Sequence, residues 1–286
     1  MSIWEAIVLG VIQGLTEFLP ISSTAHLLFA RTLMGHKNPE DAFTVVIQLG
    51  TLVAVFAYFR ADIVKLAKGW LADVRALKIG SNPDGRLAWL IVLGTLPVVA
   101  VGFAFKKWLK ATFFNLPSLA IVAIVFALLM LAAEWWAKRR KEPQREERDV
   151  GWRDAVWVGV WQAMALMPGG SRSGTTITAG LFAGLSRLAA ARFSFLLSLP
   201  AILGAGLKEL YDEYKKLKSA DGPSGLFASG DDVAALVVGT LVSAVVGYFA
   251  IAGLLRFLTR YSTAVFVGYR VLFGAMVLGL VAFKVV

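Results

Sequence analysis

The sequence predicts an all-α polytopic membrane protein with two inverted-topology repeats, each a re-entrant helical hairpin plus three transmembrane helices. Three observations lead to this prediction. The composition is strongly apolar, several apolar runs are as long as membrane spans, and motifs of the first half recur in the second. Apolar residues make up 58% of the chain and charged residues 17%, whereas soluble domains have about 45–50% and about 25%. A large soluble core is therefore excluded.

The charge distribution also points to a membrane. The net charge is +10, but Lys and Arg concentrate in loops between the apolar runs. This pattern follows the positive-inside rule rather than the basic face of a nucleic-acid-binding protein, so we expect membrane lipids and no nucleic acid as partners. The sequence has no cysteine, which excludes disulfides and thiolate metal sites. No basic segment or small-residue cleavage site precedes the first apolar run, so we expect no cleaved signal peptide.

The first repeat is predicted over residues 1–140. Its hairpin, at about 2–34, consists of two apolar segments that are each shorter than the roughly 20 residues needed to cross the bilayer. The polar break between them, at Pro20, is typical of re-entrant segments that line a cavity. A basic loop is predicted over 60–86. The three predicted spans of this repeat lie at about 43–59, 87–105 and 118–137.

The second repeat is predicted over 154–286, after a polar, exposed linker at 141–153. Its hairpin lies at about 154–186, and its spans lie at about 193–207, 233–255 and 264–284. Short motifs match between the halves and support this division: Gly10-Val-Ile-Gln13 with Gly159-Val-Trp-Gln162, and Gly94-Thr-Leu96 with Gly239-Thr-Leu241. Because each half has an odd number of spans, the second half should insert upside down relative to the first.

The loop charges predict the orientation. The loops assigned to the cytoplasm hold 17 Lys and Arg, and the opposite loops, 31–41, 106–110 and 208–218, hold nine. The cytoplasmic set is 60–86, 138–153, 187–192 and 256–260. This bias places both termini outside. It also brings the two hairpins in from opposite faces, so their polar tips are expected to meet near the midplane.

The tip of the second hairpin, 168–176, has the features of a phosphate cradle. Two adjacent glycines let the backbone approach a ligand closely. Ser171 or Ser173 can cap the helix that follows, and the start of that helix attracts anions. Arg172 adds a planar fork suited to phosphate oxygens. In the alternative interpretation the stretch is only a closely packed helix break, and Arg172 snorkels or pairs with Glu17. The residues expected to bind phosphate are Gly169, Gly170, Ser171, Arg172, Ser173, Thr176 and, from the first hairpin, Thr24.

The first hairpin carries a buried acid. Gln13 and Glu17 are spaced i, i+4 and share one face of a helix. Glu17 could hold a divalent cation, Mg²⁺ or Ca²⁺, with few protein ligands and the rest of the shell supplied by water and phosphate oxygens. In the alternative interpretation, Glu17 is a protonated or Arg-paired acid with a structural role. An ionisable group at membrane depth is by default a candidate for a functional site.

Hydroxyls and an imidazole follow directly. Ser22, Ser23 and Thr24 stand at a helix start after Pro20, and for Ser22 and Thr24 a capping role is favoured. Ser23 and His26 are spaced i, i+3, close enough for the imidazole to act on the hydroxyl. No carboxylate is spaced to orient the histidine, so phosphoryl transfer fits these residues better than an acyl-transfer triad.

With these motifs, the chain resembles the undecaprenyl-diphosphate phosphatase family, also called the bacitracin-resistance protein family. The resemblance covers the whole chain and rests on the stretch from Gln13 to His26 and on the Pro-Gly-x-Ser-Arg-Ser-x-x-Thr motif at 168–176. It implies a multi-pass enzyme of the bacterial plasma membrane that hydrolyses a polyprenyl diphosphate lipid. The products would be undecaprenyl phosphate, which is recycled for cell-wall synthesis, and inorganic phosphate. Its active site would open to the outer face.

The resemblance also implies roles for single residues. Glu17 would be the essential acid and metal ligand, Ser23 the nucleophile, His26 its acid/base partner and Arg172 the diphosphate anchor. Gln13 stands where many members have a second glutamate, which argues against a two-carboxylate metal site. The alternative function is a transporter or flippase of a lipid phosphate or anion, since inverted repeats with broken helices are common in transporters. No motif encodes the oligomeric state, so a homodimer stays open.

Overall fold

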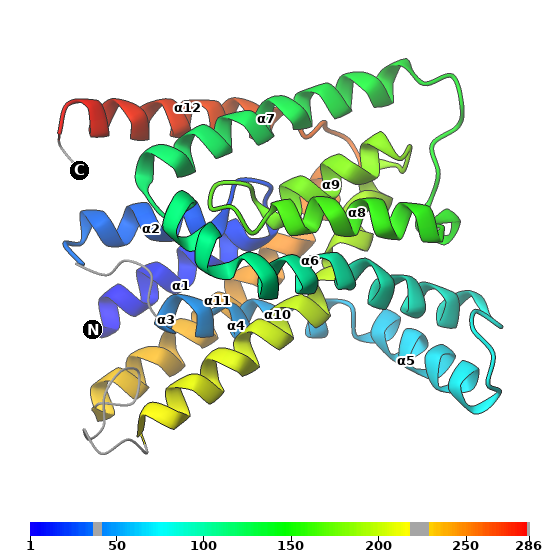
Figure 1. The fold of residues 1–286 in the computed structure, drawn as a ribbon, viewed down its shortest axis with the longest axis horizontal. Helices are drawn as coiled ribbons and strands as arrows, with labels where there is room; N and C mark the ends of the chain where they lie inside the picture. Colours follow the sequence, from blue (N-terminus) through cyan, green and yellow to red (C-terminus); the bar gives the residue numbers. More distant parts are fainter. Residues whose placement is uncertain (37–41, 218–228, 285–286) are drawn as a thin grey trace.

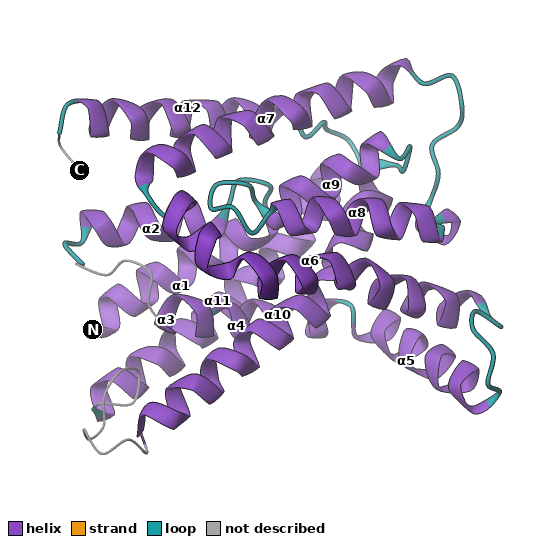
Figure 2. Cartoon of the chain, in the orientation of Figure 1, coloured by secondary structure: helices purple, strands orange, loops and turns teal. Residues whose placement is uncertain are grey.

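The structure, a computed structural model, describes residues 1–36, 42–217 and 229–284. All secondary-structure elements assigned within these residues are helices, which confirms the all-α prediction (Figures 1 and 2). Residues 37–41 and Lys218, which belong to the predicted outer loops, lie outside the described residues.

The helices of the first half are α1 (Ile3–Phe18), α2 (Ser23–Leu33), α3 (Ala42–Val46), α4 (Gln48–Tyr58), α5 (Arg60–Arg75), α6 (Pro83–Phe113) and α7 (Leu116–Arg139). Those of the second half are the short 3₁₀ helix η1 (Glu147–Asp149), α8 (Trp152–Met164), α9 (Arg172–Phe182), α10 (Arg187–Leu217), α11 (Gly230–Leu258) and α12 (Ala264–Ala282). Among the described residues, five helices are long and apolar enough to cross a membrane: α6, α7, α10, α11 and α12. A sixth span results if α3, α4 and α5, bent by 81°, are taken together. The chain is therefore a multi-pass membrane protein.

The prediction of a basic loop over 60–86 is wrong for its first 16 residues, because Arg60–Arg75 forms helix α5. Its basic residues face outward, while Leu66, Gly69 and Asp73 are buried against the rest of the molecule. The Asp73 carboxylate accepts hydrogen bonds from the backbone N–H groups of Gly80 (2.6 Å) and Ser81 (3.1 Å), so it fixes the turn into α6. A basic amphipathic helix has the low hydropathy of a loop, which explains the error.

The two hairpins share one local geometry. In each, the residue directly before the second helix is a serine with positive φ: 76° at Ser22 before α2 and 67° at Ser171 before α9. Each serine hydroxyl caps its helix by accepting from the N–H three residues on, at Ala25 (3.4 Å) and Gly174 (3.1 Å). Positive φ is uncommon outside glycine. The capping role predicted for Ser22 is confirmed.

The halves interlock through two close helix crossings. Helix α1 packs on α11 of the other half, and a Cβ on Gly10 would lie 2.7 Å from the carbonyl oxygen of Gly239. Helix α8 packs on α6, and a Cβ on Gly159 would lie 2.3 Å from the carbonyl oxygen of Gly94. At these distances no side chain fits. The four glycines are the ones that match between the halves in sequence, so corresponding residues make corresponding contacts.

A buried carboxylate joins three helices at one end of the molecule. Glu134 of α7, with a side chain 3% exposed, accepts three hydrogen bonds from Arg187 at the start of α10, at 2.9, 3.2 and 2.8 Å. It also accepts from the N–H and the hydroxyl of Thr263, the residue before α12, both at 2.8 Å. This carboxylate therefore fixes the starts of α10 and α12 on α7.

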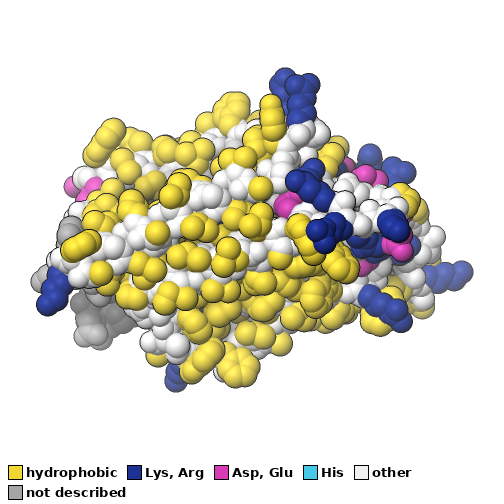
Figure 3. Space-filling view, turned by 90° about the horizontal axis from the view of Figure 1, so that it is seen from above, with side chains coloured by type: hydrophobic (Ala, Val, Ile, Leu, Met, Phe, Trp, Pro, Cys, Tyr) yellow, Lys and Arg dark blue, Asp and Glu magenta, His cyan; other side chains and the backbone are white. Residues whose placement is uncertain are grey.

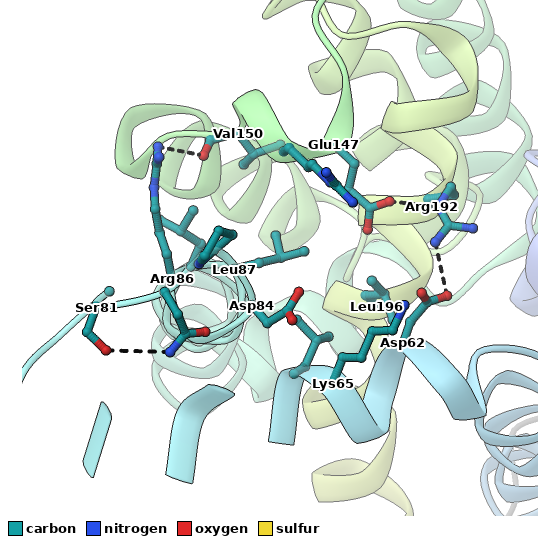
Figure 4. Close-up of a pocket in the computed structure, with 16 residues that line it drawn as sticks. Asp62, Lys65, Ser81, Asp84, Arg86, Leu87, Glu147, Val150, Arg192 and Leu196 are labelled. Atoms are coloured by element: carbon teal, nitrogen blue, oxygen red, sulfur yellow. Dashed lines mark hydrogen bonds and ion pairs between the residues drawn. The ribbon is translucent and has the colours of Figure 1, made fainter. Parts of the chain in front are cut away.

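The linker at 141–153 is largely exposed, as predicted, but two of its side chains attach it to the helices. Arg145 pairs with Asp154 of α8, and Glu147 pairs with Arg192 of α10. Figure 4 shows Arg192 extending from Glu147 to Asp62 of α5, which is 3.0 Å away. These elements enclose a cavity of about 590 Å³, none of whose lining residues belongs to the predicted site. Apolar side chains cover most of the face seen in Figure 3, and Lys and Arg gather at the end formed by α5 and the linker.

We predict that Glu134→Ala destabilises the protein by about 3–5 kcal/mol, because it leaves Arg187 and the Thr263 N–H unpaired in a buried site. Thermal unfolding in detergent, followed by tryptophan fluorescence, should show a clearly lower midpoint. Glu142→Ala is the matched control, since its side chain is 76% exposed and pairs only with Arg140. Equal midpoints for the two variants would contradict the role of Glu134.

Candidate active site

The two polar stretches meet inside the molecule. The guanidinium of Arg172, the first residue of α9, donates from Nη2 to Oε1 of Glu17 near the end of α1, at 2.9 Å. The hydroxyl of Ser173 donates to the carbonyl oxygen of Leu19, at 3.1 Å. These hydrogen bonds join the tips of the two hairpins. The juxtaposition follows from the hairpin geometry, which turns each helix start inward.

Glu17 is the centre of the site. Its side chain is 8% exposed. Oε1 accepts from Arg172, and Oε2 accepts from the Ser23 hydroxyl at 2.8 Å and from Nε2 of Gln13 at 3.0 Å. The carboxylate thus has a charged partner, which permits its burial. The Arg-paired form of Glu17, one of the two interpretations that the sequence leaves open, is the form in this structure.

The residues around Glu17 also fit a hard divalent cation. The amide oxygen of Gln13, Oε1, is buried and has no hydrogen-bond partner among the described residues. An unpartnered carbonyl oxygen, a carboxylate and a hydroxyl are the oxygen ligands that Mg²⁺ and Ca²⁺ prefer. No group of three or more His, Cys, Asp and Glu side chains that could hold a metal occurs in the described ranges. A cation at Glu17 would therefore take most of its shell from water and substrate.

The loop before α9 packs directly against the backbone of α7. Gly169 has a φ of +93°, and a Cβ there would lie 2.2 Å from the carbonyl oxygen of Leu119. Ser171 caps α9 through the N–H of Gly174. The first N–H groups of a helix have no partner within it, so those of Arg172 and Ser173 remain for an anion.

Arg172 has donor capacity left beyond Glu17. Its Nη1 donates to the carbonyl oxygen of Ser194, at 3.3 Å. Its Nε is buried and has no partner among the described residues. Thr176, in contrast, uses its hydroxyl within the fold: it donates to the carbonyl oxygen of Arg172 at 2.7 Å and shares a hydrogen bond with the Ser194 hydroxyl at 2.6 Å. Thr24 makes no hydrogen bond of its side chain within the described part of the chain.

His26 lies differently from the prediction. Its Nδ1 is 2.7 Å from the carbonyl oxygen of Ser22, and its Nε2 is 2.7 Å from the hydroxyl of Tyr269 on α12. No hydrogen bond joins His26 to Ser23 in the ranges that the structure describes. The expected direct action of the imidazole on the Ser23 hydroxyl is therefore not in place, because that hydroxyl points to Glu17 instead.

Sequence reasoning missed Arg270 and Tyr269 of α12. Arg270 is 1% exposed, and its Nη2 donates to the carbonyl oxygens of Gly169 and Gly170, at 2.8 and 3.0 Å. It therefore holds the phosphate-cradle loop in place. The sequence did contain a signal for Arg270, because it is a charged residue inside an apolar span. Arg172 was selected by the same criterion.

Comparison with known proteins shows the family to which the chain belongs. Residues 6–276 match the family described as bacitracin resistance protein BacA. The chain is 44% identical over 285 residues to an undecaprenyl-diphosphatase of Chlorobium phaeobacteroides strain BS1, and 45% identical over 285 residues to one of Prosthecochloris aestuarii. It is 44% identical to an undecaprenyl-diphosphatase of Chloroherpeton thalassium. Each of these alignments covers 99% of this chain and 98% of the relative. The chain therefore belongs to the bacitracin resistance protein BacA family.

Proposed function

We propose that this protein is an integral membrane phosphatase that hydrolyses undecaprenyl diphosphate to undecaprenyl phosphate and inorganic phosphate, so that the lipid carrier is recycled for cell-wall synthesis. Relatives named undecaprenyl-diphosphatase that match nearly the whole chain support the activity. The observation that carries the proposal is the convergence on Glu17, whose two carboxylate oxygens accept from the Ser23 hydroxyl and from the Arg172 guanidinium.

The diphosphate head binds at the start of α9. The backbone N–H groups of Arg172 and Ser173, the positive end of the helix dipole and the unpartnered Nε of Arg172 supply donors for phosphate oxygens. Phosphoryl transfer depends mostly on positioning the group and neutralising its charge. These donors are preorganised, because the cap at Ser171 and the guanidinium of Arg270 fix the loop that carries them.

Ser23 is the nucleophile in this proposal. Its Oγ attacks the terminal phosphorus, and its proton passes to Oε2 of Glu17, 2.8 Å away. The bond from that phosphorus to the bridging oxygen breaks, and undecaprenyl phosphate leaves. Water then cleaves the phosphoserine and returns Ser23. A mechanism in which Ser23 and Glu17 orient water for direct attack uses the same two groups.

His26 and the metal take supporting places. His26 does not take the Ser23 proton in this arrangement, because Ser22 and Tyr269 occupy both of its ring nitrogens. With the diphosphate bound, a phosphate oxygen replaces the Tyr269 hydroxyl at Nε2, and His26 exchanges protons with that oxygen. Glu17 and Gln13 would hold the cation. When bound, Mg²⁺ or Ca²⁺ would neutralise charge on the diphosphate.

For the membrane arrangement, we infer two inverted repeats with re-entrant hairpins. The matched serine caps and the matched glycine crossings support this arrangement. Figure 1 places the start of α1 and the end of α12 at one end of the molecule, and α5 with the linker at the other. Since the basic residues gather at the latter end, the positive-inside rule favours termini outside. A site that opens to the outer face is what this orientation together with the family resemblance implies.

The first prediction from this proposal concerns turnover. Purified protein in detergent should release phosphate from undecaprenyl diphosphate, EDTA should remove the activity, and Mg²⁺ or Ca²⁺ should restore it. Ser23→Ala should lower the rate by more than about 100-fold, because the nucleophile and its proton transfer to Glu17 are lost. Ser186→Ala, a serine before α10 whose hydroxyl bonds to Glu146 of the linker, should retain the wild-type rate.

Phosphate release in detergent separates this function from the transporter or flippase, which has no chemical step. Folded wild-type protein that releases no phosphate would sink the phosphatase proposal. Full activity of Ser23→Ala would remove Ser23 from the mechanism.

A second prediction concerns the anchor. Arg172→Ala should lower kcat/KM by about 100- to 1,000-fold, the usual loss when a donor to transition-state charge is removed. Steady-state kinetics with farnesyl or undecaprenyl diphosphate checks this result. Arg153→Ala, an exposed arginine over the ring of Trp152, is the control for net charge. Near-normal activity of Arg172→Ala would overturn the assignment.

A further inference from the structure

The ring of His26 is hydrogen-bonded at both nitrogens. The Ser22 carbonyl oxygen, 2.7 Å from Nδ1, can only accept, so Nδ1 carries a proton. In a neutral imidazole, Nε2 is then an acceptor. The Tyr269 hydroxyl, 2.7 Å from Nε2, must therefore donate to it. The Ser22 carbonyl oxygen thus selects the Nδ1–H tautomer of His26, and the Tyr269 hydroxyl donates to the nitrogen that remains.

Aromatic stacking keeps the ring in this orientation. The His26 ring lies 4.3 Å from the ring of Phe273 between centroids, at an interplanar angle of 17°. It also stacks on the ring of Tyr269, at 5.6 Å and 12°. Turning His26 toward Ser23 would break the hydrogen bond to Tyr269 and disturb both stacks. The orientation away from Ser23 is thus built by α12.

Helix α12 is itself fixed to the site. Arg270, the next residue after Tyr269, donates to the carbonyl oxygens of Gly169 and Gly170 in the phosphate-cradle loop. Consecutive residues of one helix therefore contact the imidazole of the first hairpin and the loop of the second. This arrangement couples the placement of His26 to the placement of the phosphate donors.

We propose that Tyr269 is a positioning residue of the active site: its hydroxyl holds the Nε2 edge of the His26 ring toward α12, while the Ser22 carbonyl oxygen keeps the proton on Nδ1. This inference deepens the proposed function. It rests on that function only for the part that His26 takes in turnover. It assigns to α12 a part in the site that neither hairpin motif contains. Tyr269→Phe is the informative variant, because it removes the hydroxyl and keeps the stacked ring.

The first test does not depend on activity. The chain has two histidines, so a His36→Gln background leaves His26 as the sole imidazole for ¹⁵N NMR in detergent. At alkaline pH, where imidazoles are neutral, the spectrum should show the Nδ1–H tautomer. In Tyr269→Phe the Nε2 signal should move toward that of a nitrogen without a hydrogen-bond donor, while the Nδ1–H tautomer, which the Ser22 carbonyl oxygen selects, should remain. The Nε2–H tautomer in the parent, or a spectrum unchanged by Tyr269→Phe, would overturn the proposal.

The second test uses kinetics. Tyr269→Phe should lower kcat about tenfold at unchanged KM, a part of the 100- to 10,000-fold that general acid–base catalysis typically contributes. In a His26→Ala background the same change should alter kcat by less than about twofold, because Tyr269 acts only through His26. Tyr261→Phe, an exposed tyrosine after α11, is the control and should leave kcat unchanged.

An equal loss of kcat in both backgrounds would contradict a role through His26. If the wild-type protein releases no phosphate at all, the proposed function fails, whereas the NMR result still decides how Tyr269 holds the imidazole.

Discussion

The structure depends on the pairing of one buried carboxylate with one guanidinium. Glu17 and Arg172 come from opposite halves of the chain and meet at 2.9 Å where little solvent reaches them. Neither charge could stay buried in this apolar interior alone, because an unpaired buried ion is strongly disfavoured. Docking of the hairpins therefore satisfies both charges. It also places a proton acceptor, a hydroxyl and an anion-binding helix start within one site.

The remaining features of the fold serve this contact. Glycines at the α1–α11 and α8–α6 crossings bring the first helix of each hairpin against the other half at backbone distance. The positive φ of Ser22 and Ser171 turns the second helix of each hairpin so that its start faces inward. Arg270 closes the arrangement from α12 through the carbonyl oxygens of the cradle loop. The site thus belongs to the whole chain rather than to either half.

The sequence was informative where charged or polar residues interrupt apolar runs. Broken apolar runs indicated the hairpins, and Glu17 and Arg172 stood out as charges inside them. The i, i+3 spacing of Ser23 and His26 showed that they are neighbours on a helix, but it could not show which partners their side chains would take. Ser23 bonds to Glu17, and His26 bonds to Tyr269, 243 positions away. Such choices depend on tertiary packing, which no local pattern records. Helix α5 was missed because its basic residues lower the hydropathy of an ordered helix.

The most direct test of the account is whether Glu17 and Arg172 act as one site. Calorimetry would measure the affinity of a non-hydrolysable farnesyl methylenediphosphonate, with Mg²⁺ present, for the wild type, Glu17→Gln, Arg172→Gln and the double variant. If the two residues hold one diphosphate together, the two losses of binding free energy should be non-additive by more than about 1 kcal/mol. Losses that add to within about 0.5 kcal/mol would mean independent sites and would contradict the account.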